Sequence, residues 1–292
     1  MALRTFPHSL LIRGLHSSES ALCSVPGVWS IGPWIHEDLY MPPVTNPERL
    51  RDYELLPRSD PGEQQQSSMG QEEQLLKSEG RQGDLLAMYT ALCASAVLAG
   101  VTWLAVLSNE PAKVGWFALH PTLQTISLLM FTYGILTLQP TSQPKTKAAG
   151  LARHQTAIFL VGFPSILLGT SAVAYNKWIN NKEHMTTWHG TVGYLALVWI
   201  FAQVALGGGS VWLKGSAFGG GMKAKSVWKY HRLSGYFLFP TLLFTAHLGG
   251  GWSSWGDRYV SPGLRTMAYT LAPALIALSV LVRVRPSKMK FF

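Results

Sequence analysis

Nine histidines occur in this 292-residue chain, and the ones of chemical interest lie in long apolar stretches. Burying an ionisable side chain at membrane depth is costly unless it has a partner, so a histidine there indicates function. A single one can be a core residue hydrogen-bonded to a neighbouring helix. Four of them, however, fall near the starts of four consecutive apolar segments: His120, His154, His189 and His231. Four histidines placed in this way are expected to be ligands of a bound metal centre.

Consecutive membrane helices run in opposite directions, so these histidines alternate between two faces. His120 and His189 are expected near one face, and His154 and His231 near the other. Two imidazoles at one level suit the two axial positions of a haem iron, whereas zinc takes three or four protein ligands at one place. The spacing therefore predicts two b haems, stacked across the bilayer, that exchange electrons and leave no open site for oxygen. His247, on the same expected helix as His231, is a runner-up ligand.

Small residues accompany these histidines along the same segments. They would let a wide macrocycle lie against the backbone, or they would let helices pack closely, as in other membrane bundles. Both interpretations fit the set: Gly162, Gly169, Ala172, Gly190, Gly193 and Gly235.

The elements that must position the histidines are apolar runs of about 20 residues, the length with which a helix crosses a hydrocarbon core. Six such runs follow residue 84: 85–107, 114–138, 154–175, 187–211, 230–248 and 264–282. Pro273 interrupts the last, which membrane helices tolerate. Tryptophans near the predicted ends are typical of an interfacial belt. The sequence predicts an all-α polytopic membrane protein with six transmembrane helices and a four-helix dihaem core.

The composition agrees with a membrane protein, because 48% of the residues are hydrophobic and only 13% are charged. A soluble enzyme usually has about twice that charged share. The net charge is +9, but the basic residues lie in short loops and form no continuous patch, so no nucleic acid is expected as a partner. Membrane lipid is the expected partner of the basic loops.

The basic residues also predict the orientation of the chain. Six spans place the N-terminal tail, the second and fourth loops and the C-terminus on one side, named side B, and the other loops on side A. Twelve basic residues, among them Lys145 and Lys290, fall on side B and only five on side A, which also holds Glu110, Glu183 and Asp257. Because cytoplasmic loops carry an excess of Lys and Arg, both termini are expected in the cytoplasm.

Three regions are expected along the chain: a disordered cytoplasmic tail (1–84), a transmembrane domain (85–284) and a short basic cytoplasmic C-terminus (285–292). The tail is rich in Pro, Glu, Gln and Ser, with too little apolar surface to bury. Its acid-free start weakly resembles a targeting segment. A mis-assigned start, with translation from Met41, explains the same residues equally well.

Cations on side B lie where an electron donor would dock. Lys147 and Arg153 precede His154, and Lys225 and Lys229 precede His231. They would attract an anionic reductant such as ascorbate, although the positive-inside rule explains them too. On side A, His184 in the loop NNKEHMTTWHG is a candidate contact for a substrate or ferric complex, or a solvated loop residue.

These motifs together resemble the cytochrome b561 family. ALHPTLQ, RHQ, TTWHGTVGYLAL and KYHRLSGY match its four haem-ligand sites in order, and the resemblance runs from about residue 83 to 284. The chain is most similar to the cytochrome b561 domain-containing group, with six helices and no further domain. It lacks the longer substrate motifs of the chromaffin-granule type, so its substrate-binding residues follow from position only.

The resemblance implies a transmembrane oxidoreductase in which cytosolic ascorbate reduces the side B haem and the electron passes to side A. The acceptor would be ferric iron or the monodehydroascorbate radical. A homodimer is left open, and an endomembrane (endoplasmic reticulum, vacuole or lysosome) is favoured over the plasma membrane. Two alternatives remain: a haem-binding subunit or sensor that needs a partner for electrons, and a transporter whose histidines relay protons.

Overall fold

A computed structural model describes residues 79–289, which lie in one of the chain's two units, Arg58–Phe292. The expected disordered tail, up to residue 78, and the last three residues of the expected C-terminal segment lie outside the described residues. Between residues 79 and 289 every regular element is a helix and no strand occurs. The expected all-α class is therefore confirmed.

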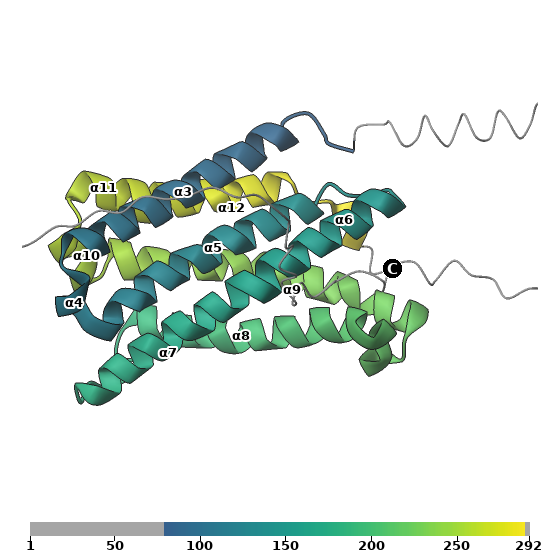
Figure 1. Cartoon of the computed structure of the whole chain (residues 1–292). Coiled ribbons are helices and arrows are strands. Elements are labelled where there is room, and N and C mark those ends of the chain that lie inside the picture. The colour runs from purple at the N-terminus through teal and green to yellow at the C-terminus, as the bar shows by residue number, and fades with distance from the viewer. Residues whose placement is uncertain (1–78, 290–292) are drawn as a thin grey trace, which may run out of the picture. The chain divides into compact units, whose positions relative to one another are not determined.

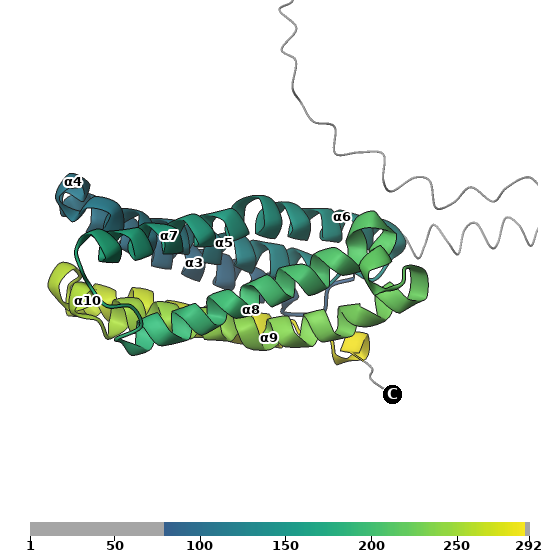
Figure 2. The same ribbon diagram turned by 90° about the horizontal axis from the view of Figure 1, so that it is seen from below.

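The long helices lie side by side, with chain direction alternating from one to the next (Figures 1 and 2). In chain order the described helices are α3 (Asp84–Ser108), α4 (Pro111–Val114), η2 (Gly115–Ala118), α5 (Leu119–Leu138), α6 (Pro144–Gln155), η3 (Thr156–Gly162), α7 (Phe163–Ile179), α8 (Trp188–Val211), η4 (Trp212–Phe218), α9 (Gly221–Gly251), α10 (Ser254–Tyr259), α11 (Pro262–Thr266), η5 (Met267–Leu271), α12 (Ala272–Val282) and η6 (Pro286–Met289). Helix α8 packs along α9, α12 along α3, and α5 between α3 and α7.

Five helical stretches of the described chain are long and apolar enough to cross a membrane: Asp84–Ser108, Gly115–Leu138, Pro144–Ile179, Trp188–Phe218 and Pro262–Val282. They coincide with five of the six expected spans, so a multi-pass membrane protein is confirmed. The sixth span, expected at 230–248, lies within α9. That helix is long enough but more polar, since lysines, an arginine and two histidines interrupt it. Six spans therefore remain a prediction.

Two helices begin about ten residues before the expected spans. The helix with His154 starts at Pro144, and the helix with His231 starts at Gly221. Both additional segments are rich in Lys, Ala and other good helix formers, which extend a helix beyond the apolar core. Pro144 stands at the first helical position, where its missing N–H costs no hydrogen bond.

Two π-helical segments precede prolines inside the bundle. Segment η3 lies just before Pro164 of α7, and η5 lies just before Pro273 of α12. A proline ring clashes with the carbonyl of the residue four before it and leaves that carbonyl without its helical donor. Widening the preceding turn relieves the clash, so the interruption expected at Pro273 becomes a local change of helix type.

The core between the helices is apolar, and several of its hydroxyls form hydrogen bonds within their own helices. Ser95 Oγ donates to the Ala91 carbonyl at 2.8 Å, and Thr102 Oγ1 donates to the Leu98 carbonyl at 2.7 Å. Because each hydroxyl bonds to the carbonyl four residues earlier, small polar side chains can be buried between helices at little cost. Histidines are thus the unusual polar groups of this bundle.

Candidate functional site

The structure brings His120 and His189 together at the side A end. His120 is the second residue of α5 and His189 the second residue of α8. Their ring centroids lie 5.8 Å apart, and the ring planes meet at 78°. Thr187 caps α8 by accepting a hydrogen bond from the Gly190 amide at 3.1 Å, which fixes the helix start next to His189.

His154 and His231 meet in the same way at the side B end. His154 lies near the end of α6 and His231 ten residues into α9. Their ring centroids are 6.3 Å apart, with ring planes at 90°. Each end of the bundle thus holds two nearly perpendicular imidazoles from helices that are distant in sequence.

Three of the four rings are oriented by backbone carbonyls of a neighbouring helix. From Nδ1, His120 donates to Gly169 (3.1 Å), His154 to Gly134 (3.2 Å) and His189 to Thr245 (2.9 Å). A ring that donates from Nδ1 keeps the lone pair on Nε2, which is the tautomer a metal ligand needs. The exception is His231, whose Nδ1 is buried and has no hydrogen-bond partner among residues 79–289.

Two glycines make room for the imidazoles of the α8–α9 pair. A Cβ at Gly249 would lie 2.6 Å from His189 Cε1, and a Cβ at Gly207 would lie 2.7 Å from His231 Cε1. Each glycine follows the histidine of its own helix by 18 residues, which is five helical turns. Histidine and glycine therefore share one face, and in antiparallel helices each histidine meets the glycine of its neighbour. This repeated spacing is a signal that the sequence interpretation missed.

The small residues singled out in the sequence serve helix packing between described side chains. A Cβ at Gly162 would lie 2.6 Å from the Phe131 ring, and one at Gly235 would lie 2.8 Å from Gln203 Nε2. Gly235 thereby allows Gln203 to donate to the His231 carbonyl at 3.0 Å. Of the two interpretations, these contacts favour close approach of helices.

The runner-up His247 lies apart from both histidine pairs. Its Nδ1 donates to the Tyr269 carbonyl in the π-helical η5 at 2.7 Å. Its ring lies beside those of Phe244 and Trp252. Tyr269 is four residues before Pro273, so its carbonyl lacks the α-helical donor and accepts from His247 instead. His247 thereby ties α9 to the last membrane helix.

The cations expected to receive a reductant all lie at the side B end. Lys147 and Arg153 are exposed on α6, and Lys225 is exposed on α9. Lys229 is half-buried, with Nζ 5.2 Å from the centroid of the Tyr230 ring. They flank the His154/His231 pair along its two helices. On side A, His184 is exposed in the loop between α7 and α8.

Lys288 is a further cation at this end, contributed by the C-terminal segment. Its Nζ donates to the carbonyls of Gln139, at 3.0 Å, and Thr141. Burial lowers the pKa of Lys288, and the nearby charges of Arg232 and Lys147 lower it further. The lysine joins the end of α5 to the C-terminal segment beside the cation cluster.

The remaining C-terminal arginines are engaged inside the bundle. Arg283 is buried and donates to the backbone carbonyls of Asp84 and Leu136, and Arg285 pairs with the Asp84 carboxylate. Burial lowers the pKa of Arg283, and Asp84 opposes that shift. The sequence analysis assigned Asp84 to the tail and counted these arginines among the basic residues of side B. Asp84 is instead the first residue of α3 and links it to the end of α12.

Glu79 is another acid that the sequence analysis assigned to the tail, and it caps the helix that carries His154. Its Oε1 accepts from the amides of Ser142 (3.0 Å) and Gln143 (2.6 Å), and from the hydroxyls of Ser142 and Thr146. Burial alone would raise the pKa of Glu79, but these hydrogen bonds bring it below its ordinary value. A carboxylate at a helix N-terminus is also favoured by the helix dipole.

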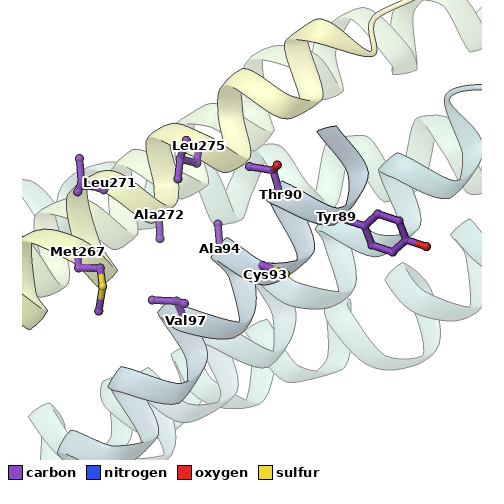
Figure 3. A pocket seen from close by; sticks show the side chains of 9 residues that line it. All are labelled: Tyr89, Thr90, Cys93, Ala94, Val97, Met267, Leu271, Ala272 and Leu275. Atoms are coloured by element: carbon purple, nitrogen blue, oxygen red, sulfur yellow. The ribbon is translucent and has the colours of Figure 1, made fainter. Parts of the chain in front are cut away.

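An apolar groove of about 500 Å³ lies apart from the histidines, between α3 and the η5–α12 stretch (Figure 3). Its residues are Tyr89, Thr90, Cys93, Ala94, Val97, Met267, Leu271, Ala272 and Leu275. Cys93 is a free, exposed cysteine there. None of the helices that form the groove carries a paired histidine, so the groove is separate from the candidate site.

A multi-pass helical bundle with a facing histidine pair at each end is the architecture of a membrane cytochrome that transfers electrons. The family model described as eukaryotic cytochrome b561 matches residues 119–255, a range that contains all four paired histidines. Over these residues the chain is similar to the cytochrome b561 family. Over 185 residues it is 28% identical to "Transmembrane reductase CYB561D2" of Bos taurus, covering 62% of this chain and 80% of that protein. Both matches support transmembrane electron transfer by an oxidoreductase at a general level.

The residues present fit such a haem at either end. With a metal–nitrogen bond of about 2.0 Å on each side, an axial imidazole pair would place its ring centroids roughly 6 Å apart. The observed centroid distances are 5.8 and 6.3 Å. No group of three or more His, Cys, Asp or Glu within residues 79–289 would hold a metal without a macrocycle. Two ligands per level therefore suit a centre whose other ligands come from a porphyrin.

Proposed function

We propose that this chain passes single electrons across a membrane through two b haems, one held by His120 and His189 and the other by His154 and His231. The observation that carries the proposal is the pair of imidazoles at each end, 5.8 and 6.3 Å apart between ring centroids. On α5, His120 and the Gly134 carbonyl that orients His154 are 14 residues apart, about 21 Å along a helix. The two levels thus reach opposite parts of the bilayer.

The protein would supply the histidine ligands, orient their rings and leave no further position on the metal open. Each histidine offers Nε2, and the Nδ1 hydrogen bonds of His120, His154 and His189 fix ring orientation and raise ligand basicity. When bound, b haem supplies an iron that changes oxidation state by one electron. Because two histidines would hold each haem, no position on the metal would be left for oxygen or a substrate, and the chemistry would be confined to electron exchange.

The side B end is the proposed entry for ascorbate, a monoanion at neutral pH. Lys147 and Arg153 on α6 and Lys225 and Lys229 on α9 flank the His154/His231 pair. Lys288 adds a fifth positive group beside Lys147. Cations grouped at one end raise the local concentration of an anion and speed its encounter.

Side A is the proposed exit, to ferric iron or the monodehydroascorbate radical, with His184 in the exposed loop beside it. We place side B in the cytoplasm and use six spans, so both termini are cytoplasmic. Of the membranes available, an endomembrane is favoured, and a homodimer is left open. The name of the bovine relative, a transmembrane reductase, supports electron transfer across a membrane.

The first test is haem per polypeptide on detergent-purified protein, by pyridine haemochrome, with absorbance spectra before and after ascorbate. We expect two haems and a reduced α-band. Protein without haem would refute the proposal. Two haems that ascorbate cannot reduce would favour the partner-dependent subunit. As a second step, His120→Ala should remove one haem and leave the His154/His231 site loaded, whereas loss of both haems from a folded variant would contradict the pairing.

A further inference from the structure

Aromatic rings link the side A histidine pair to the protein surface. The ring centroid of Phe117 lies 6.2 Å from that of His120, and 6.2 Å from that of Trp255 on the other side. Trp255 in turn lies 6.1 Å from Tyr259. Centroids 4.5–7 Å apart correspond to aromatic rings in contact. The three rings therefore form one unbroken line from His120 to α10.

Among the described residues 79–289, the side B histidine pair has no equivalent link. Within the described part of the chain, the rings of His154 and His231 are in ring contact only with each other. Cations surround that pair instead. The two ends of the bundle thus differ in the way that an entry for an anion and an exit for an electron would differ.

Local backbone structure holds the line of rings formed by Phe117, Trp255 and Tyr259, here called the ring line, in place at both ends. Phe117 lies in the short helix η2, three residues before His120, and Gly115 starts that turn with φ of 63°. At the other end, a Cβ on Gly256 would lie 1.9 Å from the Gly250 carbonyl oxygen. Only glycine permits this approach, so α10 lies directly on the end of α9 and Trp255 is held against Phe117.

The outer end of the line reaches solvent. Trp255 and Tyr259 are half-buried, whereas Asp257 and Arg258 on the same short helix are exposed. Figures 1 and 2 show α10 at the end of the bundle opposite to α6. A small molecule that touches α10 would therefore contact the ring line without entering the bundle.

We propose that Phe117 and Trp255 are the electron exit of side A, connecting the His120 site to an oxidant docked on α10. The inference rests on the proposed function. In each event one electron leaves the site held by His120 and His189, which is thereby oxidised, and the oxidant docked on α10 is reduced. A ferric chelate becomes a ferrous one, and an organic radical becomes its closed-shell form and takes the proton it needs from water. The rings lower the tunnelling barrier across the gap and are themselves neither oxidised nor reduced.

The test compares Trp255→Leu, which removes the ring, with Trp255→Phe, which keeps one. The matched control is Trp252→Leu, since Trp252 is exposed and contacts His247 outside the line. Haem content and midpoint potentials are measured first in the full-length protein. Reoxidation of the ascorbate-reduced protein by ferric citrate is then followed by stopped flow. We expect Trp255→Leu to slow this step about tenfold, because its ring contacts are lost, and the other two variants to retain the original rate.

Two results would overturn the proposal. Unchanged reoxidation of Trp255→Leu would show that the electron leaves by another route. A changed midpoint potential or haem content in Trp255→Leu would show that Trp255 acts by positioning His120. Failure of the proposed function is distinguishable from both, because the unmodified protein would then carry no haem, or haem that ascorbate does not reduce, before any variant is compared.

Discussion

Replacing Gly249 by alanine should selectively empty the side A haem site. The added Cβ would lie 2.6 Å from His189 Cε1, whereas ordinary contact begins at 3.4 Å, so the imidazole has to move by about 0.8 Å. Metal and catalytic sites tolerate about 0.5 Å of displacement. The shift would also misalign Nδ1 with the Thr245 carbonyl, now 2.9 Å away. Loss of such an outer hydrogen bond typically weakens metal binding about 10–100-fold.

Gly207→Ala is the mirror experiment at side B, because its Cβ would lie 2.7 Å from His231 Cε1. Gly100→Ala is the control: Gly100 lies inside α3 with nothing within 4 Å of an added Cβ. Haem per polypeptide should fall from two to about one in either site variant and stay at two in the control. Two retained haems in Gly249→Ala would refute the reasoning. So would an equal loss in Gly100→Ala.

Two further predictions concern the acids that fix the side B end. Glu79→Ala should cost about 1 kcal/mol, as for a lost helix cap. Because the pKa of Glu79 lies below its ordinary value of 4.5, its contribution is full above that pH and is lost as pH falls through the lowered value. Thermal unfolding in detergent between pH 3 and 7 should show a weaker acid dependence in the variant, and identical curves would refute the cap. Asp84→Asn leaves Arg285 unpaired next to buried Arg283; about 3–5 kcal/mol should be lost on denaturant unfolding, and a loss below 1 kcal/mol would contradict the network.

Much of the fold could be predicted because it depends on composition over whole segments. Five of the six apolar runs coincide with apolar helices of membrane-spanning length, and α9 differs because its charged first half extends beyond the expected span. The histidine pairing could be inferred from alternation alone, since antiparallel helices bring the starts of alternate segments to one end. The composition of a segment and the alternating direction of consecutive helices stay the same when a helix end is misplaced by several residues.

The parts that could not be predicted depend on single contacts between distant residues. The bond between Glu79 and the Gln143 amide joins residues 64 positions apart, and Arg283 reaches the Asp84 carbonyl across 199 positions. Nothing near Glu79 or Asp84 in the sequence marks either contact, so both acids were assigned to a disordered tail. The charge pattern predicts that cations gather at one end of the bundle. It does not show which of them, such as Arg285, form ion pairs with acids.

The π-helical segment η3 has a physical role in holding both histidine levels at once. Helices α5 and α6–α7 are antiparallel partners joined by two hydrogen bonds, from His120 to Gly169 and from His154 to Gly134. The two contacts are 14 residues apart on α5 but 15 residues apart on the partner. Regular α-helices could not satisfy both, because one extra residue adds about 1.5 Å and turns the helix by about 100°. A π-turn takes in an extra residue over nearly the same height, and η3 lies between His154 and Gly169. Pro164, which causes the widening, therefore sets the register with which one helix pair orients a ligand at each end of the bundle.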